Sequence, residues 1–238
     1  SSGVVLSDYS FVDSAQNSIR NRIRDYNQAN QSQPTPGVLP PTYNPEEPDT
    51  EITVPDDPVD TDIIPTYLAF SCEDSQGLSE ILDTLDSRNQ RAIFFFDIQG
   101  LEREDDLIFR ILGSGYSIGL IAQGRSVSAT HRLLEEANQT LSQVAYTRTS
   151  VVLVPENQRD ALEEEGWICW NETVSAVPTQ GVGTNTYANQ VLKRISGNYA
   201  RVYLTLDASS ETARVLPTLL RRLSEEGYGV SVPLETRL

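Results

Sequence analysis

The chain has 238 residues, and its 34 acidic and 18 basic side chains give a net charge of −16 at pH 7. Nucleic acids and anionic membranes bind proteins through clustered Lys and Arg, so this charge excludes both as partners. The chain has no methionine and no apolar run of about 18 residues, so we expect any membrane attachment to come from a leader or anchor that precedes Ser1.

The first segment, residues 1–31, carries a helical pattern. Apolar side chains recur at spacings of three and four between residues 8 and 31, namely Phe11, Val12, Ala15, Ile19, Ile23 and Tyr26. This spacing predicts a helix whose remaining surface is polar. Such a helix is either a stalk or an element that docks on the domain or on a second protein.

Residues 32–65 form the second segment, which is rich in proline and acidic residues and contains no basic residue. Proline and charge repulsion both favour an extended chain, so we expect a linker here. The third segment, residues 66–238, is then the folded domain.

Strand-like and helical patterns alternate within residues 66–238. The strands are expected at 67–71, 92–97, 117–122, 150–154, 167–170, 201–206 and 229–232. The helices are expected at 77–88, 104–113, 129–144, 157–166, 186–195 and 210–227, with C-cap glycines at Gly113, Gly166 and Gly227. This alternation predicts an α/β fold, an irregular (β/α) barrel of about seven parallel strands that is closed or nearly closed.

Cysteine and histidine are residue types that often carry chemistry, and the chain has two cysteines and one histidine. Cys72 and Cys169 lie in apolar, strand-like contexts, so we expect buried free thiols; a single disulfide between them is the alternative. His131 is the only histidine of the chain. It lies near the start of a predicted helix, where we expect a surface or capping role and no catalysis.

A strand, a helix and a second strand carry the most informative motifs. Residues 69–73 read Ala-Phe-Ser-Cys-Glu, and residues 91–95 read Arg-Ala-Ile-Phe-Phe. Together with residues 107–119, 163–167 and 216–228, these segments resemble the polysaccharide deacetylase family of carbohydrate esterases. Members of that family have Thr-Phe-Asp-Asp-Gly and Lys-Ala-Thr-Phe-Phe at the first two places.

The resemblance implies hydrolysis of an N-acetyl group, in which one Asp and two His hold a metal ion, a second Asp is the base and a late His is the acid. Each of these residues is replaced. Ser71 stands in place of the base, and the three metal ligands correspond to Cys72, Ile121 and Arg125. Leu206 stands in place of the acid. We therefore expect no zinc and no other cofactor.

Two motif residues of the family are retained, Arg148 and Asp207. Ionisable or aromatic residues that could contact a ligand at the mouth of the barrel are Glu73, Asp74, Arg125 and Trp170.

The leading hypothesis is a catalytically inactive deacetylase-like domain at the cell surface that binds a glycan or a protein partner. A second is a divergent carbohydrate deacetylase or hydrolase that uses Glu73, Asp74, Arg148 and Asp207, which would have to converge in one cleft with raised carboxylate pKa values. A third is a structural or assembly protein in which residues 8–31 bind the partner.

Overall fold

Eight short apolar segments form one parallel sheet in the computed structural model, which describes residues 63–197 and 199–231. The strand order is β5-β4-β3-β2-β1-β7-β6, and β8 also pairs with β1. The strands are β1 (Ile64–Ser71), β2 (Ile93–Phe96), β3 (Ser117–Ile121), β4 (Val151–Leu153), β5 (Ile168–Cys169), β6 (Val174–Ser175), β7 (Val202–Asp207) and β8 (Tyr228–Val230). The predicted parallel α/β sheet is confirmed.

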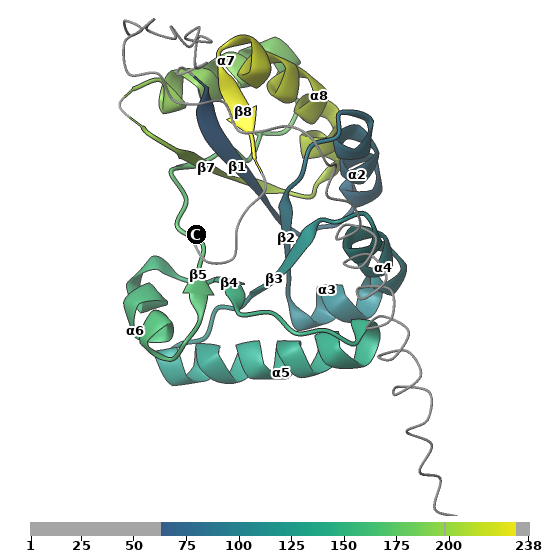
Figure 1. The fold of residues 1–238 in the computed structure, drawn as a ribbon, viewed down its shortest axis with the longest axis vertical. Coiled ribbons are helices and arrows are strands. Elements are labelled where there is room, and N and C mark those ends of the chain that lie inside the picture. The colour runs from purple at the N-terminus through teal and green to yellow at the C-terminus, as the bar shows by residue number, and fades with distance from the viewer. Residues whose placement is uncertain (1–62, 198, 232–238) are drawn as a thin grey trace, which may run out of the picture. The chain divides into compact units, whose positions relative to one another are not determined.

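Helices cover the outer side of this curled sheet (Figure 1). They are α2 (Leu78–Ser87), α3 (Ile98–Arg103), α4 (Asp105–Gly113), α5 (Val127–Ala145), α6 (Arg159–Glu164), α7 (Thr184–Ile195) and α8 (Ser210–Glu225), with a 3-10 turn at Glu156–Gln158. Neighbouring helices contact one another around the sheet, α5 with α4, α2 with α8, and α8 with α7. Strand residues that alternate toward these helices, such as Leu68, Phe70 and Phe94, build the larger of two buried cores.

Two elements escaped sequence prediction, the two-residue strand β6 and the helix α3. Both are too short to show a period. Gly166 and Gly227 have the positive φ expected of C-cap glycines, at 97° and 83°. At the end of α4 the positive φ of 81° belongs to Gly115, so the prediction of Gly113 as the cap was wrong by two residues.

The first strand begins earlier than the predicted range 67–71, because β1 starts at Ile64. Pro65 lies opposite Gly229 of β8, and pairing with β7 begins only at Thr66. A proline is tolerated there because no strand needs its missing N–H. The predicted helix at 8–31 and most of the linker at 32–65 lie outside the described residues. No helix within the described ranges has the length and apolar character to cross a membrane.

The sheet is a partial barrel, since β5 and β6 end the strand order and are not paired with each other in the described part of the chain. Side chains on its inner face form a second buried core, Ala69, Ile93, Phe95, Val151 and Trp170, against which Tyr67, Ile121, Leu153, Ile168 and Tyr203 pack. The inside of the partial barrel is therefore filled.

Trp170 lies at the centre of this inner core and is 1% exposed. Its ring makes edge contacts with Phe95 and Tyr203, at centroid distances of 6.1 and 5.4 Å. Its Nε1 donates a 2.9 Å hydrogen bond to Thr205 Oγ1 on β7. Trp170 follows the end strand β5, so this bond links that end of the open sheet to β7, the neighbour of the other end strand β6. The expectation that Trp170 contacts a ligand was wrong, because the side chain is part of the core.

Gly119 of β3 makes room for this inner core. A Cβ at this position would lie 2.4 Å from Cε1 of Phe95 and 2.9 Å from the carbonyl oxygen of Val151. Any other residue would displace the Phe95 ring from its place in the inner core.

Replacing Trp170 tests its core role. We expect Trp170→Ala to lower the free energy of unfolding by about 3 to 5 kcal/mol, the usual range for a large buried aromatic. Trp170→Phe keeps an aromatic ring but removes the bond to Thr205, so a loss between about 1 and 3 kcal/mol is expected. Urea unfolding followed by circular dichroism measures both. A loss below about 1 kcal/mol for Trp170→Ala would contradict a packed inner core.

Candidate functional site

The loops that follow the strands gather at one edge of the sheet, because all of the strands run in parallel. β1 ends at Ser71, which is level with Phe95 of β2 and Asp207 of β7. This carboxyl edge is where α/β barrels place their ligands. Ser71, the turn after it, Ile121 and Asp207 therefore meet at one edge.

Ser71 and Cys72 are the residues that the sequence resemblance matches to the two family aspartates. Ser71 is half-buried, and its hydroxyl lies 3.5 Å from Oε2 of Glu73. Cys72 is fully buried in the helix-side core, with Sγ 3.7 Å from the carbonyl oxygen of Phe70. Burial raises the pKa of the Cys72 thiol well above its usual range, which disfavours the thiolate that binds metals. This position has become part of the core.

The other replaced positions also lack metal-binding character. Ile121 packs against the inner core, and Arg125 is exposed in the loop before α5. Leu206 is fully buried and faces the helices. The preceding residue, Thr205, faces the barrel interior, where it holds Trp170. The structure therefore does not direct the Leu206 side chain into the mouth.

Asp207 is engaged in holding a helix. Its Oδ1 accepts hydrogen bonds from the backbone N–H and the hydroxyl of Ser209, at 3.3 and 2.7 Å, and from the hydroxyl of Thr212. Ser209 in turn caps α8 by accepting from the N–H of Thr212 at 3.2 Å. This network fixes the start of α8 and accounts for a retained aspartate without catalysis.

Within residues 63–197 and 199–231, no group of three or more His, Cys, Asp and Glu side chains is placed to hold a metal ion. A catalytic zinc site needs at least three such ligands. Since Cys72 is buried and Ile121 and Arg125 cannot ligate, the residues present do not fit the metal of the family.

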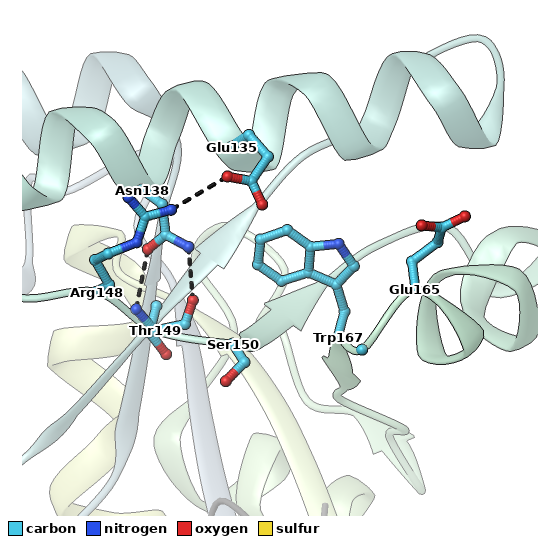
Figure 2. Close-up of a pocket in the computed structure, with 8 residues that line it drawn as sticks. Glu135, Asn138, Arg148, Thr149, Ser150, Glu165 and Trp167 are labelled. Atoms are coloured by element: carbon cyan, nitrogen blue, oxygen red, sulfur yellow. Dashed lines mark hydrogen bonds and ion pairs between the residues drawn. The ribbon is translucent and has the colours of Figure 1, made fainter.

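Arg148 lies at the other end of the sheet, just before β4 (Figure 2). Its guanidinium pairs with Glu135 of α5 at 3.1 Å. Asn138 holds the adjoining strand by accepting from the N–H of Thr149 at 2.9 Å and donating to its carbonyl at 2.8 Å. Arg148, Glu135 and Asn138 line one hollow, and the indole of Trp167 also lines it. We call it the Arg148 hollow.

This placement contradicts the convergence that the hydrolase hypothesis requires. Glu73 and Asp74 follow β1 and Asp207 ends β7, all at the carboxyl edge, whereas Arg148 precedes β4 at the opposite edge. His131 lies near the start of α5, where its Nδ1 accepts a 2.9 Å hydrogen bond from Nε1 of Trp167.

A hollow of about 330 Å³ opens at the carboxyl edge beside the replaced metal positions. Its apolar wall consists of Ile98, Ile121, Ala122 and Leu133, and its polar wall consists of Glu73, Asp97, Gln99 and Gln123. Its volume falls in the range of small-molecule sites. Of these residues, only Glu73 and Ile121 were expected from the sequence to belong to a site.

Asp97 and Gln99 were missed because they belong to the short helix α3. Asp97 is its N-cap, and Oδ1 accepts from the N–H of Gly100 at 2.7 Å. An aspartate directly after an apolar strand was the available signal, since such a residue both caps a helix and faces the strand-end edge.

Two further hollows adjoin this one through shared residues. One of about 410 Å³ shares Glu73 and is also lined by Asp74, Ser75, Gln76, Arg103 and Glu104. Another of about 210 Å³ shares Ile121, Ala122 and Gln123 and is also lined by Leu153, Val154 and Pro155. We call these three adjoining hollows the edge groove.

The curled parallel sheet with helices outside it is the fold of polysaccharide deacetylases. The chain aligns with the crystal structure of the polysaccharide deacetylase Bc1974 from Bacillus cereus at a TM-score of 0.61 and 16% identity, over 74% of this chain and 94% of that one. The resemblance noted from the sequence is thereby confirmed. No family model matches the chain.

Among individual proteins, the chain is similar to YheN of Bacillus subtilis strain 168, which is named as a polysaccharide deacetylase. The two sequences are 24% identical over 195 residues, which cover 71% of this chain and 67% of YheN. It also aligns with BA3943 of Bacillus anthracis, a CE4 family pseudoenzyme, at a TM-score of 0.61 and 14% identity, over 71% of this chain and 63% of that one.

Thiol chemistry tests the burial of the two cysteines, both of which are free as predicted. Burial raises the pKa of Cys169 to about 11 and that of Cys72 well above its usual range. Because only the thiolate reacts, we expect iodoacetamide to label neither thiol in the native protein at pH 8 and both after unfolding. Mass spectrometry counts the labels. Rapid native labelling of Cys72 would show that its position is open to solvent.

Cys72→Asp restores the residue type of the family at a position that is now core. We expect a loss of at least about 3 kcal/mol at neutral pH, because a buried carboxylate lacks hydration. Burial raises the folded-state pKa of such an Asp, so the deficit grows as pH rises above the ordinary value of about 3.9. Urea unfolding across pH measures it. Cys72→Ser is the control, and equal stability of the two variants at neutral pH would contradict conversion into core.

Proposed function

We propose that this domain binds a glycan in the edge groove and does not hydrolyse it. The observation that carries the proposal is that two features lie at the same edge of the sheet, side chains that cannot hold a metal ion and an open hollow beside them. The metal positions hold Cys72 in the core and Ile121 against the inner core, while the hollow beside them remains open at about 330 Å³.

The lining of the groove suits a sugar ring. A pyranose has apolar C–H faces and a rim of hydroxyl groups, so it needs an apolar surface bordered by hydrogen-bonding groups. Ile98 and Ile121 supply the first, and the amides of Gln99 and Gln123 supply donors and acceptors for the second.

The absence of hydrolysis follows from the side chains that replace the catalytic set. Ser71 is not basic near neutral pH, Arg125 cannot ligate a cation, and His131 lies on α5 with Trp167. The pseudoenzyme BA3943 has the same fold, so this scaffold exists elsewhere without its usual activity. The proteins similar to this chain that are named for polysaccharide deacetylation support a glycan as the ligand. They also support a location at the cell surface, outside the membrane.

Titration calorimetry with amino-sugar tetramers tests the proposal. We expect the protein to bind at least one of two tetramers, N-acetylated or free, with no release of acetate whether or not zinc is added. The double variant Gln99→Ala, Gln123→Ala should weaken binding about tenfold, because each amide removes one or two hydrogen bonds to the sugar.

Glu165→Gln is the matched control, since Glu165 lines the Arg148 hollow at the opposite edge. Its binding should equal that of the unaltered protein. Acetate release together with stoichiometric zinc would overturn the proposal, as would failure to bind either tetramer.

A further inference from the structure

We propose that the glycan is cationic, an amino-sugar polymer whose amino groups are free and not acetylated. This inference rests on the proposed function, because it names the ligand of the same groove. It adds a preference that the fold alone does not imply, for the product of deacetylation over its substrate.

In the edge groove, the hollow of about 330 Å³ lies between the other two, and we call it the central hollow. The charged side chains that line it are all acidic. Glu73 and Asp97 stand on its polar wall, and the other lining residues are amides and apolar groups. Asp97 is fixed in place because Oδ1 caps α3 through Gly100. Its carboxylate is therefore held at the rim of the hollow at little further entropic cost on binding.

The acidic lining continues into the adjoining hollow that shares Glu73. Asp74 and Glu104 line it together with one guanidinium, that of Arg103. Arg103 is already engaged, with Nε 3.1 Å from Glu104 Oε1 and Nη2 3.3 Å from Ser75 Oγ. Arg103 thus offsets Glu104, and the remaining charge of the two hollows is negative.

This charge distribution discriminates between two forms of the same polymer. Hydrolysis of an N-acetyl amide by water yields acetate and a primary amine, and the amine is protonated at mildly acidic pH. The amine form carries a positive charge on each sugar, whereas the acetylated form is neutral. Carboxylates in a partly enclosed groove favour the ammonium form through charge-assisted hydrogen bonds.

The apolar wall favours a glycan over a basic peptide. Ile98, Ile121 and Leu133 form a surface beside the carboxylates. A sugar ring places its C–H face and its ammonium group within one unit, so it can contact both walls at once. The net charge of −16 also attracts cationic polymers over longer distances. The reaction that supplies such a ligand is N-deacetylation by an active enzyme.

Calorimetry with two tetramers at mildly acidic pH tests the inference. We expect the glucosamine tetramer to bind about tenfold more tightly than its fully N-acetylated form, since two partly solvated ion pairs each add a few-fold. The double variant Glu73→Gln, Asp97→Asn keeps side-chain shape and the cap of α3, and should remove this preference. Binding of the acetylated tetramer should weaken less than that of the glucosamine tetramer, because the acetylated form has no ammonium group to pair with these two carboxylates. Glu165→Gln at the opposite edge is again the control.

Three outcomes would overturn the inference and leave glycan binding in place: equal affinity for both tetramers, tighter binding of the acetylated form, or a variant that weakens both tetramers alike. Tetralysine is a further probe, and if it binds as tightly as the glucosamine tetramer, the groove is a general site for polycations. Failure to bind either tetramer would instead overturn the proposed function itself.

Discussion

The hydrogen bond from Trp170 to Thr205 links one end of a sheet that does not close to β7, the strand beside its other end. Parallel strands that curl leave an interior that side chains must fill. In a partial barrel the two end strands are not paired with each other, so the side chains of the interior must hold the curl. The indole provides both bulk and a polar bond, and Gly119 leaves the space that Phe95 needs beside it. The curvature that brings the strand ends together at the edge groove depends on this inner core.

Much of the fold could be predicted from the sequence because its signals are local. Apolar runs such as residues 67–71 and 92–97 alternate with amphipathic helices, and only a parallel sheet accommodates that order. The strand β6 and the helix α3 were missed because two and six residues are too few to show a period.

The site was harder to predict, because a strand reverses the direction of its side chains at every residue. Thr205 and Leu206 are adjacent, yet one faces the interior and the other faces the helices. Likewise, which end of β4 carries Arg148 depends on where a three-residue strand begins. Matching a motif to the sequence finds the right strand, but a shift of one residue along that strand moves the side chain to the other face.

The side chains at Cys72 and Ile121, the positions that match family metal ligands, have a simple physical consequence. Buried carboxylates and imidazoles are costly to keep unless they bind a metal or a substrate. A thiol and an isoleucine remove that cost and extend the core to the edge of the sheet, while the retained Asp207 serves the cap of α8. Carboxylates at the rim, such as Glu73, remain solvated and so can persist.

The opening between β5 and β6 also bears on how copies of this protein behave at high concentration. A free sheet edge invites another chain to pair with it, and long flat edges lead to aggregation. Here the outermost strands of the described sheet are two residues each, so each offers too few backbone groups to start a ladder. A barrel left open in this way gains little tendency toward intermolecular strand pairing.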